Sequence, residues 1–383
     1  MKLLFYALFS VFLFACSGTH RDKAEASPIV QHFRSDSNLV TFARGFKLYR
    51  SVALTRIIVM DPWHMPDTLA TYLLLPDTAD LKRYKGKADF VLHVPVKKVA
   101  SLSSTCLGMF RLLGRSDLII ASTNANMIYD STLYHRYLNG SLTDLGEGMQ
   151  LNAELIIGQN PDLVMKYIYG SHDPADDKIA AAGIPIAFNL EFMETHPLGR
   201  AEWLKFVAAF CGTQRQADSV FSLISRHYLA LTKQTAGVRH HPEVLDGSSY
   251  KGVWYEAGGK SYPAKLYEDA GADYYWKNDT SRGSIPLSFE TILEKQGNAD
   301  FWFGPSSESK AELLGIESRY ALLKSFRNGN VFQFGKRINP HGGLDYYESG
   351  VTRPDILLKD IISVLHPELI GSKYETVYLE RVK

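Results

Sequence analysis

The stretch NAELIIGQNPDLVM, residues 152–165, contains the local pattern on which the fold prediction rests. Residues 153–159 are expected to form a short helix with an early glutamate, Glu154. Pro161 then leads through a turn into an apolar strand that ends at Met165. A helix, a turn and a buried strand in this order are typical of a layer of helices packed on a sheet.

The stretch SFETILEKQGNADFWF, residues 288–303, follows the same plan. It has two extra residues between Glu290 and Asp300, compared with the interval from Glu154 to Asp162. A short helix carries Glu290 in its first turn, and a buried strand follows at 301–303. Two copies of one plan are what two similar lobes around a cleft would produce.

Short apolar strands alternate with helical stretches from Val94 to the end of the chain. These strands are too apolar for a sheet with one face in water, which favours parallel sheets covered by helices. Between the two halves, residues 215–232 repeat apolar side chains at the three-and-four spacing of a helix about 27 Å long. The predicted fold class is therefore α/β, with two lobes of mostly parallel sheet covered by helices and joined by a single long bridging helix.

The first residues resemble a bacterial lipoprotein signal. Lys2 precedes an apolar run from Leu3 to Phe14, and Ala15-Cys16 matches the lipobox, in which the cysteine is lipidated. Simple secretion and a membrane helix are the alternatives, although twelve apolar residues rise only about 18 Å. The expected organisation is a signal peptide at 1–15, a polar tether at 16–37, a strand-rich extension at 38–93, lobe one at 94–212, the bridging helix at 213–236 and lobe two at 237–383.

Composition excludes several classes of protein. The chain has 383 residues, of which 45% are hydrophobic, and its 42 basic and 41 acidic residues leave a net charge of +1. A disordered or coiled-coil protein is excluded, and no basic field indicates a nucleic-acid partner. After loss of the signal, Cys106 and Cys211 accompany Cys16. They could pair in an oxidising compartment, and buried free thiols are the alternative that we favour.

Four segments together are similar to one known family: residues 154–164, 181–186, 197–217 and 288–303. They resemble the periplasmic binding proteins that feed ABC importers of vitamin B12, ferric siderophores and haem. The resemblance implies a ligand held between two α/β lobes, and the membrane subunits of an importer as partner. It also implies that Glu154 and Glu290, one on each lobe, dock onto arginines of those subunits. Stabilisation of the two helix starts is the alternative role, because acids in a first turn favour a helix.

Loops at the ends of the predicted strands should supply the ligand surface. Tyrosines in such loops offer both aromatic faces and hydroxyl groups to a large flat ligand, although core packing is the alternative for each ring taken singly. Lysine and arginine would answer the charge of an anionic siderophore. The predicted ligand-binding residues are Ser104, Tyr129, Tyr167, Tyr169, Trp254, Tyr255, Lys260, Lys336, Arg337, His341 and Tyr346. Other residues in the same loops are Ser103, Thr105, Asn124, Asn126, Glu191, Phe192, Tyr250, Gly258, Gly259, Ser261, Tyr262, Asp345 and Tyr347.

Catalytic and cofactor motifs are incomplete. Residues 258–261 end like a phosphate loop, but the earlier glycine that such a loop requires is replaced by Trp254. We therefore expect a binding protein with no cofactor of its own, lipid-anchored in a bacterial envelope and facing the periplasm, with the inner and outer membrane both open. Its ligand is expected to be a metal chelate, either a cobamide or a ferric siderophore. The alternatives are haem, ligated by a tyrosine or His341, and a surface lipoprotein or enzyme that works without an importer.

Overall fold

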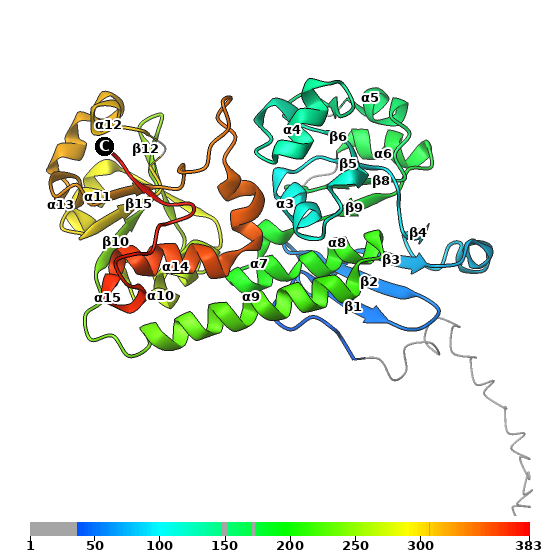
Figure 1. The fold of residues 1–383 in the computed structure, drawn as a ribbon, viewed down its shortest axis with the longest axis horizontal. Coiled ribbons are helices and arrows are strands. Elements are labelled where there is room, and N and C mark those ends of the chain that lie inside the picture. The colour runs from blue at the N-terminus through cyan, green and yellow to red at the C-terminus, as the bar shows by residue number, and fades with distance from the viewer. Residues whose placement is uncertain (1–36, 148–151, 171–172, 306) are drawn as a thin grey trace, which may run out of the picture. The chain divides into compact units, whose positions relative to one another are not determined.

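The computed structural model describes residues 37–147, 152–170, 173–305 and 307–383, so the predicted signal peptide, Cys16 and most of the tether lie outside the described residues. Lobe one contains a five-stranded sheet whose neighbouring strands are all parallel, in the order β7-β6-β5-β8-β9 (Figure 1). Its strands are β5 (Val99–Ser101), β6 (Ile119–Ser122), β7 (Thr143–Asp144), β8 (Leu163–Lys166) and β9 (Ile186–Phe188). Its helices are α3 (Ser104–Leu112), α4 (Ser131–Leu138), α5 (Ala153–Gly158) and α6 (Pro174–Ala181).

Lobe two contains a second five-stranded sheet, in the order β13-β10-β15-β16-β17, with β16 and β17 as its antiparallel pair. The strands are β10 (Glu243–Asp246), β13 (Asp273–Tyr274), β15 (Phe301–Phe303), β16 (Val331–Gln333) and β17 (Glu380–Arg381). The helices include α10 (Tyr262–Asp269), α11 (Phe289–Gln296), α12 (Lys310–Ile316), α13 (Lys324–Arg327), α14 (Pro354–Leu365) and α15 (Pro367–Ile370). The predicted fold class is confirmed.

A small antiparallel sheet in lobe two departs from the predicted alternation of strand and helix. It consists of β11 (Ser248–Tyr250), β12 (Val253–Ala257) and β14 (Ser284–Leu287). Along β12, Trp254 and Glu256 are buried whereas Tyr255 is exposed, as expected of a strand with one face in the core. The sequence around Trp254 had been expected to continue the parallel sheet, and the antiparallel pairing of β12 with β11 and β14 corrects that expectation.

Helix α9 (Gln214–Thr235) is the bridging helix, and its 22 residues correspond to about 33 Å. It follows α7 (Pro197–Glu202) and α8 (Leu204–Cys211), and it packs against α8 at one end and α14 at the other (Figure 1). The apolar stripe predicted within residues 215–232 is buried at Ala217, Phe221, Ile224 and Tyr228. Among the described residues, no helix is long and apolar enough to cross a membrane.

The strand-rich extension belongs to the core of lobe one. Its sheet contains β1 (Phe46–Arg50), β2 (Thr55–Met60), β3 (Thr68–Leu75) and β4 (Phe90–His93). Tyr72 stacks on Phe90 at 5.1 Å, meets Phe206 and Phe210 of α8 edge-on, and accepts a hydrogen bond from the backbone N–H of Phe188 at 3.0 Å. Because these rings share one buried cluster, the extension and lobe one exclude water together.

The two cysteines of the described body are free and buried, as favoured from the sequence. Burial raises the pKa of the Cys106 thiol to about 12, although Asn189 donates a hydrogen bond to its Sγ. A thiol of this kind is unreactive at neutral pH.

A buried carboxylate holds the segment that leads into β1. Glu202 accepts hydrogen bonds from the backbone N–H groups of Thr41, Phe42 and Ala43 at 2.6–3.0 Å. Glu202 is fully buried and also pairs with Lys205 at 2.8 Å. Donors held on an ionised acceptor form stronger hydrogen bonds than neutral pairs do, so this carboxylate fixes residues 41–43 onto α7.

Replacement of Glu202 tests this attachment. Glu202→Ala leaves three backbone donors and the Lys205 ammonium without their acceptor, and it should lower the free energy of unfolding by roughly 3 kcal/mol. Urea denaturation followed by tryptophan fluorescence measures the change. Glu268→Ala, which removes a carboxylate whose side chain is 70% exposed, should change the same quantity by less than roughly 0.5 kcal/mol. Equal effects of the two variants would contradict the attachment.

A segment of lobe two, residues 336–350, reaches across to lobe one, and we call it the strap. Figure 1 shows it rising between the two lobes before α14. Asn339 Nδ2 donates to the carbonyl oxygens of Asn126 and Ile128 at 2.8 and 3.0 Å. The Glu348 carboxylate accepts from the backbone N–H groups of Tyr129 and Asp130 at 2.5 and 3.0 Å. The strap therefore forms a second connection between the lobes, in addition to α9.

Candidate functional site

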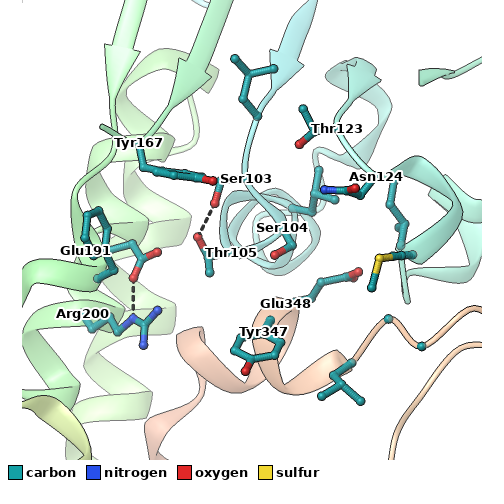
Figure 2. Close-up of a pocket in the computed structure, with 18 of the residues that line it drawn as sticks. Ser103, Ser104, Thr105, Thr123, Asn124, Tyr167, Glu191, Arg200, Tyr347 and Glu348 are labelled. Carbon is teal, nitrogen blue, oxygen red and sulfur yellow. Dashed lines mark hydrogen bonds and ion pairs between the residues drawn. The ribbon is translucent and has the colours of Figure 1, made fainter. Parts of the chain in front are cut away.

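A cavity of about 350 Å³ lies between the carboxyl ends of the lobe-one strands and the strap. This edge of a parallel sheet is where ligands bind in α/β folds. Figure 2 shows lobe-one side chains on one side of the cavity and Tyr347 and Glu348 of the strap on the other. Its polar and aromatic lining residues are Ser103, Ser104, Thr105, Thr123, Asn124, Tyr167, Tyr169, Glu191, Phe192, Arg200, Tyr347 and Glu348.

The loop from β5 into α3 contributes hydroxyl groups. The Ser103 and Thr105 hydroxyls are 2.7 Å apart, and Ser104 is exposed at the first position of the helix. Asn124, after β6, has a left-handed backbone with φ of +50°, a conformation that asparagine tolerates better than most residues. These short polar side chains can donate to and accept from a ligand.

Three rings form an aromatic wall of the cavity: Tyr167, Tyr169 and Phe192. The ring centroid of Tyr169 lies 5.2 Å from those of Tyr167 and Phe192, and Tyr169 is 66% exposed. Behind this loop, Trp63 of the extension packs against Gly170, where a Cβ would lie 3.3 Å from the indole. The loop that carries Tyr167 and Tyr169 is therefore in contact with a residue that is distant in sequence and outside the cavity.

A buried ion pair forms the floor of the cavity. Arg200 of α7 donates through Nε to the Glu191 carboxylate, as the dashed line in Figure 2 indicates. The Arg200 guanidinium also lies over the Tyr262 ring, 4.5 Å from its centroid. Burial lowers the pKa of Arg200, but the charge and hydrogen bond of Glu191, together with the nearby Tyr262 and Tyr346 hydroxyls, raise that pKa above its ordinary value. The Arg200 guanidinium is therefore charged and is paired with the Glu191 carboxylate.

Glu348 is a second carboxylate at the cavity, 2% exposed. Burial raises its pKa to about 7, helped by the charges of Asp345 and Asp130 and opposed by the N–H groups of Tyr129 and Asp130. Its ionised form is the one that accepts both backbone hydrogen bonds. The contact between the strap and lobe one is thus made by a group that titrates near neutral pH.

A fold of this kind with a cavity at the strand ends can be compared with known proteins. Residues 99–338 match the family model for periplasmic binding protein. The chain belongs to the periplasmic binding protein family. This confirms the family inferred from the sequence resemblance, and it makes the chain a binding protein rather than an enzyme.

Relatives of this periplasmic binding protein include two uncharacterized lipoproteins of Methanocaldococcus jannaschii. One is 28% identical over 376 residues, covering 94% of this chain and 90% of the relative. The other is 28% identical over 304 residues, covering 76% of this chain and 70% of the relative. A periplasmic haem-binding protein from Pseudomonas aeruginosa shares the fold, with a TM-score of 0.57 and 18% identity over 75% of this chain and 98% of that one.

Three of the predicted ligand-binding residues line the cavity of this periplasmic binding protein: Ser104, Tyr167 and Tyr169. All three follow strands of the lobe-one sheet, where the sequence pattern predicted a ligand surface.

Five other predicted residues, four of them in the strap, lie outside the cavity. Arg337 pairs with Asp345 at 2.8 Å and lies over the Tyr129 ring, so Arg337 and Tyr129 help to join the strap to lobe one. Tyr346 stacks on Phe334 at 4.6 Å, and its hydroxyl meets that of Tyr262. Lys336 Nζ donates to the Thr376 carbonyl oxygen at 2.5 Å, and His341 is exposed with its ring 6.3 Å from that of Tyr134.

The lobe-two residues are not on this cavity either. Trp254 is a correction: it is fully buried against Trp302 at 5.4 Å and donates to the Glu256 carboxylate, so it has no free face for a ligand. Tyr255 is exposed on the outer face of β12. Lys260 lies in a separate groove of about 860 Å³, lined also by Arg44 and Arg282.

Sequence reasoning missed Arg200, Thr123 and Glu348 as cavity residues. Arg200 lies in α7, for which no site residue was predicted, and Glu348 reaches the cavity through the strap, whose contacts are more than 200 residues away along the chain. Neither position has a local pattern that would have revealed it.

Glu154 and Glu290 occupy equivalent positions on the two lobes. Each lies in the first turn of its helix, after Asn152 and Ser288, which accept the capping hydrogen bonds at 3.0 and 3.1 Å. Their side chains are 72% and 70% exposed. Hydrogen bonds from Lys178 to Glu154, and from its own backbone and Arg319 to Glu290, lower the pKa of each carboxyl. The caps do not need these carboxylates, which project as exposed anions.

Replacement of a glycine in the strap tests whether the strap closes the cavity. A Cβ at Gly343 would overlap the Met127 carbonyl oxygen of lobe one, whereas Gly283 has open space around it. Gly343→Ala should detach the strap and expose the backbone N–H groups of Tyr129 and Asp130, increasing their hydrogen–deuterium exchange by about tenfold or more. Gly283→Ala should leave their exchange unchanged. Unaltered protection in Gly343→Ala would show that the strap does not hold these groups.

Proposed function

We propose that this protein is the lipid-anchored solute-binding component of an ABC importer, and that it captures a metal chelate, either a cobamide or a ferric siderophore. The observation that carries the proposal is the cavity at the carboxyl ends of the lobe-one strands, with its aromatic wall and hydroxyl groups. Such a lining suits a ligand with flat apolar faces and a few polar groups at its edge. The description of two relatives as lipoproteins supports an anchor at Cys16 in the envelope.

In the proposed cycle, the solute enters the cavity and contacts the aromatic wall and the strap. Lobe two rotates slightly against lobe one about α9, and the loaded protein docks on the membrane subunits through Glu154 and Glu290. The exposed position of these two carboxylates, one on each lobe, supports this docking.

Haem is a second candidate ligand. Three tyrosines line the cavity, and a tyrosine oxygen can ligate haem iron. His341 lies outside the cavity, so a tyrosine is the better candidate for that role.

Calorimetric titration tests the ligand class. The mature chain, titrated with cyanocobalamin, ferric siderophores and haemin, should bind a member of this panel with one-to-one stoichiometry. Tyr167→Ala should weaken that binding by about tenfold, because stacking of a flat group on one aromatic side chain contributes ~1–3 kcal/mol where it has been measured for nucleic-acid bases. Tyr255→Ala, which removes an exposed tyrosine outside the cavity, should leave the affinity unchanged. Absence of binding across the whole panel would reject the proposed class.

Charge reversal tests docking. The double variant Glu154→Lys, Glu290→Lys should abolish solute uptake in reconstituted vesicles that contain the importer, while the solute affinity of the free protein stays the same. The matched control is Asp117→Lys, Glu268→Lys, which reverses two exposed acids with 65% and 70% exposure on other elements of the same two lobes. Uptake that survives in the first variant, or is lost equally in the second, would contradict docking through these positions.

A further inference from the structure

The cavity carries no surplus positive charge. Among the described residues that line it, the charged side chains are Glu191, Arg200 and Glu348. The Arg200 charge is balanced by Glu191, with which it forms a buried ion pair. The remaining N–H groups of Arg200 can donate to a neutral oxygen of a ligand, but no unbalanced cation is left to attract an anion.

Two arginines at the contact between the strap and lobe one are already engaged by acids. Arg337 pairs with Asp345 at 2.8 Å, and Arg111 lies 3.4 Å from Asp130 and 3.8 Å from Asp345. Asp130 and Asp345 are buried, so these pairs are partly shielded from water. An anionic ligand would have to compete with buried carboxylates for each of these guanidinium groups.

The aromatic wall favours the opposite charge. The faces of Tyr167, Tyr169 and Phe192 carry the negative part of the ring quadrupole, which attracts cations that lie over them. Glu191 immediately precedes Phe192 in the same turn, and Glu348 faces the cavity from the strap. Aromatic faces and carboxylates therefore surround the space that a ligand would occupy.

We infer that the cavity selects solutes whose enclosed portion is neutral or positively charged, and that it discriminates against anionic solutes. This inference rests on the proposed function, because it specifies the charge of the chelate that the protein binds. Anionic triscatecholate chelates and the carboxylates of haem are disfavoured. Neutral cobamides and neutral or cationic hydroxamate chelates are favoured.

A series of chelates that differ only in charge tests the inference. Ferric desferrioxamine B carries a free ammonium group, its N-acetyl derivative is neutral, and its N-succinyl derivative carries a carboxylate in the same place. Calorimetric titration of the mature chain should give a dissociation constant at least about tenfold higher for the succinyl derivative than for the parent. Cyanocobalamin and its monocarboxylic acid form a second series for which the neutral form should bind more tightly.

A variant of the ion pair provides the mechanism-specific test. Glu191→Gln leaves the Arg200 charge unbalanced at the floor, so it should reduce the discrimination between the parent and the succinyl derivative by about tenfold. Asp117→Asn makes the same change in net charge at an exposed acid paired with Arg115, and it should leave the ratio unchanged. Thermal unfolding checks that both variants are folded. If Glu191→Gln does not fold, the two chelate series on the unaltered chain decide.

The outcomes separate the inference from the function on which it rests. If the chelates bind and the anionic member of each series binds as tightly as the others, the charge selection is wrong and the proposed function stands. If a folded Glu191→Gln variant keeps the ratio of dissociation constants of the unaltered chain, the Glu191–Arg200 ion pair is not the cause of the charge selection. If no chelate of any charge binds, both the proposed function and the inference are rejected.

Discussion

The contact between the strap and lobe one requires the backbones to approach closely at two glycines. A Cβ at Gly108 of α3 would overlap the Glu348 carbonyl oxygen, and a Cβ at Gly343 would overlap that of Met127. This approach brings the Glu348 carboxylate onto two backbone N–H groups and brings Tyr347 to the cavity. The cavity is therefore formed jointly by the two lobes, because lobe two contributes one wall of it through the strap.

Charge compensation is the second theme of the site. Buried ions are costly unless they are paired or hydrogen-bonded, and here each buried carboxylate near the cavity has such a partner. Glu191 has Arg200, Glu348 has two backbone N–H groups, and Asp345 has Arg337. The same compensation operates at Glu202, which holds the extension. Partners for buried carboxylates are thus found both where the extension is attached and in the cavity for which we propose a neutral or cationic solute.

The sequence allowed the fold to be predicted well, because apolar strands and amphipathic helices carry their periodicity locally. Ser104, Tyr167 and Tyr169 could be placed at the site for the same reason, since each follows a predicted strand. Arg200 and Glu348 could not, because their positions depend on contacts between distant segments. Trp254 was misplaced because its local pattern does not distinguish a cleft loop from an antiparallel strand with one buried face.

Two connections between lobes have a mechanical consequence. With α9 as the single connection, lobe two could rotate relative to lobe one about several axes. With the strap held on lobe one as well, the two attachments define an axis, and rotation about that axis is the motion that leaves both intact. Since the cavity is walled by lobe one and the strap, it would keep its shape during such a rotation.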